Sequence, residues 1–132
     1  MWTVYNKEIV KDICKASDSE ITRKTYSFYR VMNYRCGDKA MCEILDNKGF
    51  YFATRAKNHI RLIEIAVRND IKGQGIGRKV LNRLLMRAKA LGITKITLRT
   101  PINEKAAEFW LHIGAKIVGV KDNDYEMELN IE

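Results

Sequence analysis

The stretch Lys72-Gly73-Gln74-Gly75-Ile76-Gly77 decides the fold of this chain, because it separates two segments with different hydrophobic periods. Before it, Ile60–Val67 is rich in β-branched residues, which predicts a strand. After it, apolar residues recur at helical spacing over 76–91, and Gly92 follows where a helix-ending glycine belongs. The segment 95–100 is strand-like again. Strand, helix and strand in this order predict a right-handed parallel crossover.

The segments on either side of this unit extend it to a mixed α/β fold. Two helices and a hairpin are expected before it, with Asp18 or Ser19 capping the second helix. A helix capped by Asn103 and a final hairpin are expected after it. The sequence therefore predicts a single domain over 1–132, in which helices flank both faces of a mixed central sheet. The expected helices lie at 7–14, from about 20 and at 103–113, and the outer strands at 40–45, 50–54, 115–120 and 124–130, with turns at 46–49 and 122–123.

The composition is that of one globular domain, with 132 residues, of which 46% are hydrophobic and 30% charged. No apolar run approaches the roughly 20 residues that cross a bilayer. The N-terminal segment has no apolar signal sequence, so no membrane partner and a cytoplasmic location are expected. Cys14, Cys36 and Cys42 follow no metal-binding spacing. We expect them to be free thiols, and we expect no metal site.

The net charge of +8 is unevenly distributed along the chain. Between Ile71 and Asn103 there are eight Lys or Arg residues and no acid, a pattern that attracts a polyanion. This polyanion is either a nucleotide cofactor or a nucleic acid. Lys79, Arg83 and Arg87 recur at helical spacing, so a nucleic-acid-binding module using the basic helix 78–89 is the less favoured alternative.

The glycine-rich stretch itself predicts an anion site. Glycines between a strand and a helix let main-chain N–H groups approach an anion closely, and the helix N-terminus adds its own unpaired donors. A Walker loop requires a different spacing of glycines before a Gly-Lys pair. The dinucleotide fingerprint also fails, because Arg78 occupies the place of its third glycine and no acid follows at the required distance.

Val67, Lys72, Gly75 and Gly77 stand at the spacing of another phosphate loop. This pattern resembles the acyl-CoA loop of the GCN5-related N-acetyltransferase (GNAT) family, in which Arg or Gln is usual at the place of Lys72. The resemblance continues over about residues 60 to 120. A later family segment is matched in order and spacing by Asn103, Ala106, Phe109, Trp110 and Gly114.

The resemblance implies an enzyme that transfers an acetyl group from acetyl-CoA to a primary amine of a small molecule or protein. It implies a GNAT fold and a monomer or homodimer. A family member that binds CoA without catalysis is a second alternative. The main chain at the end of one strand would pair with the pantetheine arm, the loop would hold the pyrophosphate, and an asparagine would contact the far side of the cofactor. The implied CoA-binding residues are Ile65, Ala66, Val67, Lys72, Gly73, Gln74, Gly75, Ile76, Gly77, Arg78 and Asn103.

Transfer to an amine also needs a general base. Glu64 is the candidate, because it is the only acid in its strand, and Glu43 is the next. The alternative is that Glu64 is a solvated or salt-bridged strand residue that points away from the core. Trp110 stands where the family often has a phenol, and an indole N–H is no usable acid. Tyr125 or water would then protonate the leaving thiolate, or the thiolate leaves unassisted.

Several aromatic and histidine side chains complete the candidates. Four aromatic residues on the second helix are expected to pack in the core or to line an acceptor pocket. His112 is expected to be a surface or packing residue, and His59 to lie in a turn before its strand. The four aromatic residues are Tyr26, Phe28, Tyr29 and Tyr34.

Overall fold

The computed structural model describes residues 1–131, except for the side chains of Glu20, Ile21, Thr25, Arg30, Val31 and Tyr34. Within this range one sheet has the strand order β1-β2-β3-β4-β5-β7-β6. The strands are β1 (Trp2–Val4), β2 (Ala40–Leu45), β3 (Gly49–Arg55), β4 (Ile60–Val67), β5 (Lys95–Pro101), β6 (Lys116–Lys121) and β7 (Asp124–Asn130). The helices are α1 (Lys7–Lys15), α2 (Glu20–Cys36), α3 (Ile76–Ala90) and α4 (Lys105–His112), with short 3₁₀ turns at Gly37–Lys39 and Asn69–Ile71.

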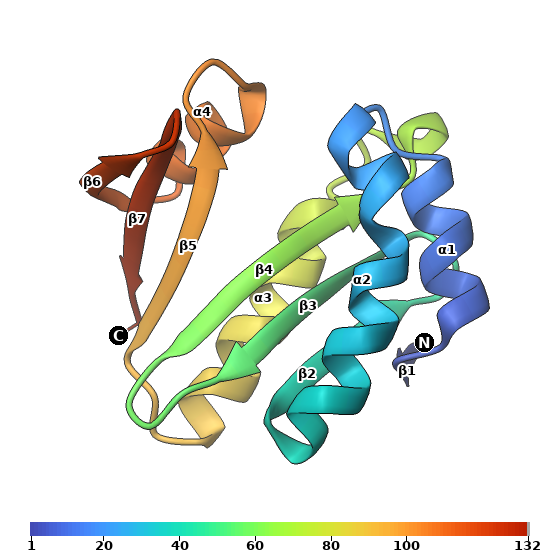
Figure 1. The fold of residues 1–132 in the computed structure, drawn as a ribbon, viewed down its shortest axis with the longest axis horizontal. Coiled ribbons are helices and arrows are strands. Elements are labelled where there is room, and N and C mark those ends of the chain that lie inside the picture. Colours follow the sequence, from blue (N-terminus) through green and yellow to red (C-terminus); the bar gives the residue numbers. More distant parts are fainter. Residues whose placement is uncertain (132) are drawn as a thin grey trace.

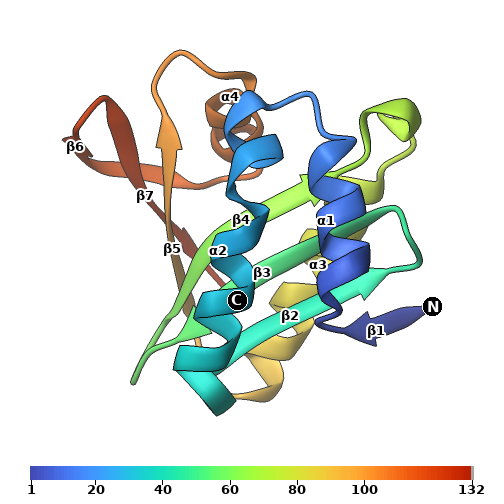
Figure 2. The same ribbon diagram turned by 45° about the vertical axis from the view of Figure 1, so that its right-hand side comes forward.

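Helices cover both faces of the sheet, as the sequence predicts (Figure 1). Helices α1 and α2 lie on one face and α3 on the other, which the turned view in Figure 2 also shows. Strand β3 supplies both cores, because successive side chains point to opposite faces. Phe50 and Phe52 pack under α1 and α2, whereas Tyr51 packs under α3. Trp110 of α4 belongs to the same core as Tyr51.

Neighbouring strands are antiparallel except for β4 and β5. These two are joined through α3 by the predicted parallel crossover. They pair only at Ile60 with Ile96 and at Arg61 with Thr97. Beyond these pairs the strands diverge, which separates the β1–β4 and β5–β7 parts of the sheet (Figure 1). We use the term opening for this divergence of the two strands.

Strand β4 carries a bulge at Ile63. Phe52 pairs with Glu64 and Ala53 pairs with Leu62, so Ile63 is an extra residue on β4. The side chain of Leu62 lies in the core on the α3 face, and side chains two residues apart in a regular strand point to the same face. A regular strand would therefore turn Glu64 toward α3. The bulge reverses the alternation, and the side chain of Glu64 faces α2 instead.

Helix α3 begins and ends at glycines in left-handed conformations. Gly75 is the N-cap with φ of 76°, and Gly92 follows the C-terminus with φ of 73°. At the C-terminus Gly92 N donates to Lys89 O and Ile93 N donates to Ala88 O. These two bonds form a Schellman motif, which confirms the helix end predicted from the sequence.

Three local predictions need correction. Strand β1 was not expected, because three residues are too few for a visible alternation. The first hairpin turn is one residue shorter than predicted, because Gly49 already pairs with Leu45 in β3. Asn103 is not a helix cap, since α4 begins at Lys105 with Glu104 at the N-cap position. The second hairpin turn, 122–123, and the Ser19 cap of α2 are as predicted.

Gly49 of β3 lies against the end of β4 and the first residue of α3. A Cβ atom there would stand 2.9 Å from Ala66 O and 3.0 Å from Ile76 Cγ2. We therefore expect Gly49→Ala to lower the free energy of unfolding by about 1–3 kcal/mol, as overpacking does elsewhere. Gly77→Ala is the control, because its Cβ would meet only Val67 Cγ2 at 3.7 Å. Urea denaturation of both variants checks this, and equal stabilities would contradict it.

Candidate active site

The opening between β4 and β5 leaves main-chain groups without strand partners. On β4, residues Ile65–Val67 pair with β3 along one edge. Among the described strands, the other edge of β4 has no partner beyond Arg61. Unpaired N–H and C=O groups of this kind form a template that an extended chain of amide groups can pair with.

The glycine loop lies at the end of β4, where α3 begins. The first helical bond of α3 runs from Lys79 N to Gly75 O, so the preceding N–H groups have no acceptor inside the helix. A Cβ added to Gly73 or Gly75 would meet nothing within 4 Å. The loop is therefore open, and its donors and the helix dipole favour an anion there.

The other predicted loop residues divide into two groups. Gln74 and Arg78 are exposed beside the open loop, whereas the side chains of Ile76 and Ala66 are buried in the two cores. Ile76 and Ala66 therefore offer only their main-chain groups to a ligand. The ammonium of Lys72 forms an ion pair with Asp18, which lies between α1 and α2.

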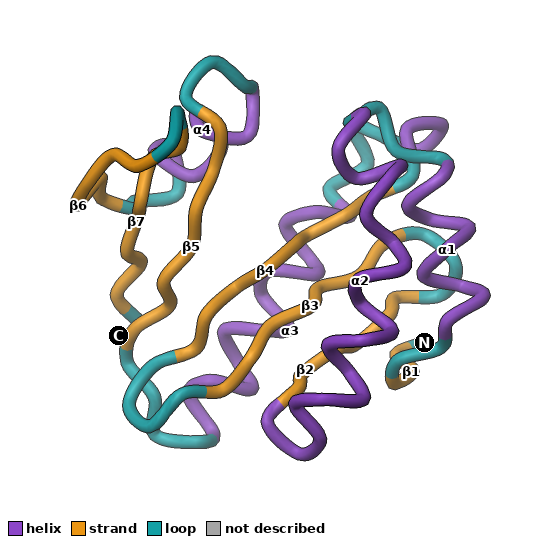
Figure 3. The backbone as a smooth tube through the Cα atoms, viewed as in Figure 1, coloured by secondary structure: helices purple, strands orange, loops and turns teal. Residues whose placement is uncertain are grey.

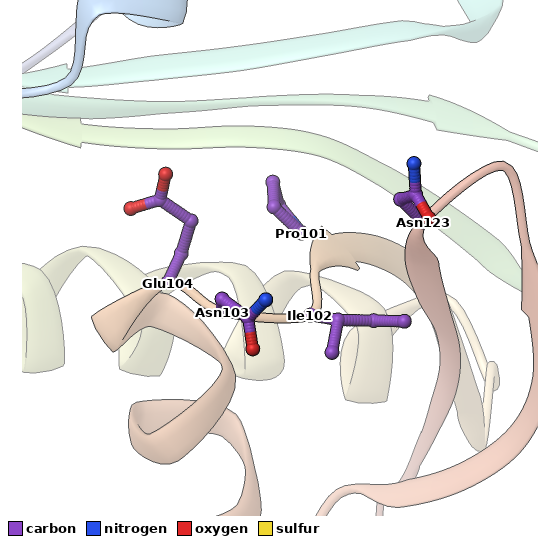
Figure 4. A pocket seen from close by; sticks show the side chains of 5 residues that line it. All are labelled: Pro101, Ile102, Asn103, Glu104 and Asn123. Carbon is purple, nitrogen blue, oxygen red and sulfur yellow. The ribbon is translucent and has the colours of Figure 1, made fainter.

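Asn103 lies on the far side of the opening from the glycine loop, where β5 ends. It lines a hollow of about 430 Å³, together with Pro101, Ile102, Glu104 and Asn123. Figure 4 shows that these side chains come from the end of β5, the segment before α4 and the β6–β7 turn. Asn103 is exposed, so its amide is available to a ligand.

Glu64 stands on the diverging part of β4, on the face covered by α2. Thr22 Oγ1 donates to Glu64 Oε1 at 3.2 Å, and the Tyr29 hydroxyl donates to Glu64 Oε2 at 3.3 Å. Burial raises the pKa of Glu64 to about 7, although both hydrogen bonds act in the opposite direction. A carboxyl group with this pKa exchanges its proton near neutral pH, which suits a general base.

The partners of Glu64 were not identified from the sequence. Tyr29 was expected only as a core or pocket aromatic, and Thr22 was not considered. Both are buried on α2 and lie seven positions apart, which is about two helical turns. A same-face polar pair on a helix was the available signal, but nothing in the sequence indicates which strand it meets.

Comparison with known proteins identifies the family of this chain. The acetyltransferase (GNAT) family model matches residues 39–115, which is more than half of the chain. This chain belongs to the GNAT family. No curated protein sequence matches it significantly.

Solved structures with low sequence identity share the GNAT fold over nearly the whole chain. PaiA N-acetyltransferase from Thermoplasma acidophilum, in complex with coenzyme A, is 17% identical over 98% of each chain, with a TM-score of 0.79. Ard1 from Thermoplasma volcanium is 13% identical over 100% of this chain and 97% of its own, with a TM-score of 0.80. The ribosomal-protein-S18-alanine N-acetyltransferase from Escherichia coli is 16% identical over 100% and 94%, with a TM-score of 0.78.

Glu43, the second candidate base, faces α3 on the opposite side of this GNAT sheet. It accepts hydrogen bonds from the Tyr51 hydroxyl at 2.6 Å, Arg83 Nε at 3.0 Å and Arg87 Nη1 at 2.9 Å. Burial alone would raise the pKa of Glu43, but these bonds and the two arginine charges outweigh it and lower the pKa. Glu43 is thus an ionised, fully bonded anchor for α3 and is unsuited to accept a further proton.

The contacts of Glu43 also explain the basic stripe of α3, which consists of Lys79, Arg83 and Arg87. Arg83 and Arg87 point back to Glu43, and the Arg83 guanidinium also stacks over the Trp2 ring at 5.4 Å. Of the three stripe members, only Lys79 has none of these contacts with the sheet. The stripe therefore binds the helix to the sheet, which weakens the argument for a nucleic-acid surface.

The expected acid candidates lie on the α4 side of the sheet. Trp110 is buried and packs edge-on against Phe109 at 5.2 Å, so it serves the core. Tyr125 pairs with Thr100 across β5 and β7 and packs against the same core. Both lie on the face opposite to Glu64.

The remaining candidates are aromatic side chains of α2 and the two histidines. Phe28 is exposed, and Lys11 and Lys15 stack on the Tyr26 ring at 5.8 and 5.7 Å. His59 lies in the turn before β4 and His112 is exposed at the end of α4, as expected. The side chain of Tyr34 is outside the described part of the structure.

The cysteines and the acidic and histidine side chains of the described residues were the other candidates for a site. The cysteines are free, and burial raises the pKa of Cys14 and Cys42 to about 12. Over the described residues, no group of His, Cys, Asp and Glu is placed to hold a metal ion. No helix in that range is long and apolar enough to span a membrane.

The raised pKa of Glu64 predicts how stability depends on pH. The folded protein holds this proton up to about pH 7, whereas an unfolded Glu releases it near 4.3. The resulting stabilisation is present below about pH 4 and is lost as the pH rises to about 7. As the pH rises from about 4 to about 7, we therefore expect the free energy of unfolding of Glu64→Gln to increase by roughly 1–3 kcal/mol relative to that of wild type.

Urea denaturation at a series of pH values tests this expectation. Glu108→Gln, at an exposed position of α4, controls for the general loss of one carboxylate. Parallel stability curves for wild type and Glu64→Gln would show that Glu64 is not a buried titrating group.

Proposed function

We propose that this GNAT-family protein is an acetyl-CoA-dependent N-acetyltransferase that acetylates a primary amine. The observation that carries the proposal is the position of Glu64, a carboxyl group with a pKa of about 7, on the strand that diverges from its parallel neighbour. Membership of the family supports an acyltransferase. The arrangement of this chain's residues supports amine acetylation as the reaction and acetyl-CoA as the acetyl donor.

Three features of the chain fit an acyl-CoA. The open glycine loop and the unpaired donors of α3 suit a pyrophosphate. The free edge of β4 suits the two amides of a pantetheine arm. Within the described residues, Thr100 Oγ1 on the diverging part of β5 is a buried polar atom without a hydrogen-bond partner, and a polar group of a bound acyl-CoA would supply one. Bound acetyl-CoA would supply an activated acetyl thioester.

In this proposal the pyrophosphate is held by main-chain groups of the glycine loop, with charge from nearby side chains. The main chain of Ile65, Ala66 and Val67 holds the pantetheine arm, and Asn103 contacts the cofactor from across the opening. The loop residues are Lys72, Gly73, Gln74, Gly75, Ile76, Gly77 and Arg78.

Glu64 would act as the general base. In its carboxylate form it accepts a proton from the acceptor ammonium, directly or through water, because only a neutral amine has a lone pair for attack. Thr22 and Tyr29 hold the carboxyl group in place and stabilise its ionised form. Because both donors are neutral, the pKa stays high enough for proton transfer near pH 7.

The protein need not supply an acid for the leaving group. Trp110 is buried and packs in the core. A thiol has a pKa near 8.5, so a thiolate is a tolerable leaving group in water. The acceptor is defined only as a primary amine, since α1, α2 and the β6–β7 turn, which flank the opening, carry no recognisable specificity motif.

Binding of CoA is tested by placing a carboxylate in the glycine loop. Gly75→Glu should weaken CoA binding about tenfold or more in calorimetry, because it sets a negative charge against the pyrophosphate. Gly92→Glu is a matched control, since Gly92 has nearly the same φ at the other end of α3. Equal binding by the two variants would contradict the assignment of the loop.

Catalysis is tested by thiol release from acetyl-CoA across a panel of primary amines. Glu64→Gln should lower kcat by about 10²–10⁴, the usual contribution of a general base. In wild type kcat/KM should rise through about pH 7, and Tyr29→Phe should move this rise to higher pH, because it removes a hydrogen bond that lowers the pKa of Glu64.

A flat pH profile, or full activity of Glu64→Gln, would exclude Glu64 as the base. Tight CoA binding without turnover on any amine would favour a CoA-binding GNAT-family protein that is not an enzyme.

A further inference from the structure

Lys72 in the glycine loop forms an ion pair within the protein itself. Its ammonium contacts the carboxylate of Asp18, which lies between α1 and α2, and both side chains are about half exposed (47% and 50%). We propose that Asp18 is a built-in counter-ion that the cofactor's pyrophosphate must displace from Lys72. This inference rests on the proposed function.

The two segments that carry this ion pair are fixed side by side. Asn69 N donates to Ala16 O at 2.8 Å, which joins the β4–α3 segment to the end of α1. Both segments lie at the same end of the sheet in Figure 3. The ion pair is therefore not a chance meeting of two mobile side chains, because the main chains already hold their residues close together.

The charges around Asp18 keep it ionised. The hydrogen bond from Lys72 lowers the pKa of Asp18, against a smaller effect of burial, and the charge of Lys105 on α4 adds to the lowering. Asp18 thus lies in the positive field of residues from both sides of the opening. A pyrophosphate bound in the glycine loop would enter the same field and would compete with the carboxylate for it.

Asp18 is also connected to the candidate base. The next residue, Ser19, caps α2 by accepting a hydrogen bond from Thr22 N at 3.3 Å. Thr22 Oγ1 in turn donates to Glu64. A change of partner at Lys72 therefore frees Asp18 beside the N-terminus of α2, the helix that carries the two hydroxyl donors to Glu64.

A double-mutant cycle on CoA affinity tests the inference. Asp18→Asn should tighten CoA binding roughly two- to fivefold at low salt, the range of an exposed ion pair. In a Lys72→Gln background the same substitution should have no effect, because no ammonium remains to be released. Asp12→Asn, an exposed position on α1, controls for the change in net charge and should leave affinity unchanged.

The outcomes separate this inference from the proposed function. Wild-type binding of CoA with no gain in Asp18→Asn, or an equal gain with and without Lys72, would overturn the counter-ion role alone. Failure of the wild-type protein to bind CoA would overturn the proposed function and this inference with it. A gain in affinity that depends on Lys72 would support both.

Discussion

The brief parallel pairing of β4 with β5 is the constraint on which the rest of the site depends. Two residue pairs hold the strands together, and then each follows its own antiparallel partner, β3 or β7. This divergence leaves the edge of β4 beyond Arg61 without a strand partner in the described sheet. The crossover that joins the two strands starts at the same end, so the glycine loop and the N-terminus of α3 lie beside the opening. One topological feature thus brings together an unpaired strand edge and a cluster of N–H donors.

Two glutamates, one buried and one half-buried, show how one sheet provides different electrostatic environments on its two faces. Glu43 faces α3 and meets two arginines, so its pKa falls and it serves as an ionic anchor. Glu64 faces α2, where it accepts hydrogen bonds from two neutral hydroxyl groups, so burial dominates and its pKa rises. The partners, not the residue type, decide whether a buried carboxyl group is an ion-pair partner or a base. The anchor also fixes α3, and with it the position of the glycine loop.

Much of the fold follows from signals that are local in the sequence. Glycines at both ends of α3, helical spacing between them and a two-residue turn between β6 and β7 each depend on a few neighbouring residues. Their positions were predicted for that reason, and so was the glycine loop as an anion site. The errors, at β1, Gly49 and Asn103, concern element ends and a very short edge strand, where local preference is weak and pairing with distant residues decides.

The sequence by itself determined the order of the elements, the parallel crossover and the glycine loop at the start of α3, because backbone conformation and hydrophobic period are set within each segment. Only the tertiary structure decided which face Glu64 occupies, since a single bulged residue at Ile63 reverses the alternation. Only the tertiary structure paired Arg83 and Arg87 with Glu43, and Lys72 with Asp18. These contacts join residues about 40 to 54 positions apart, so they depend on how helices pack on the sheet, which no local pattern specifies.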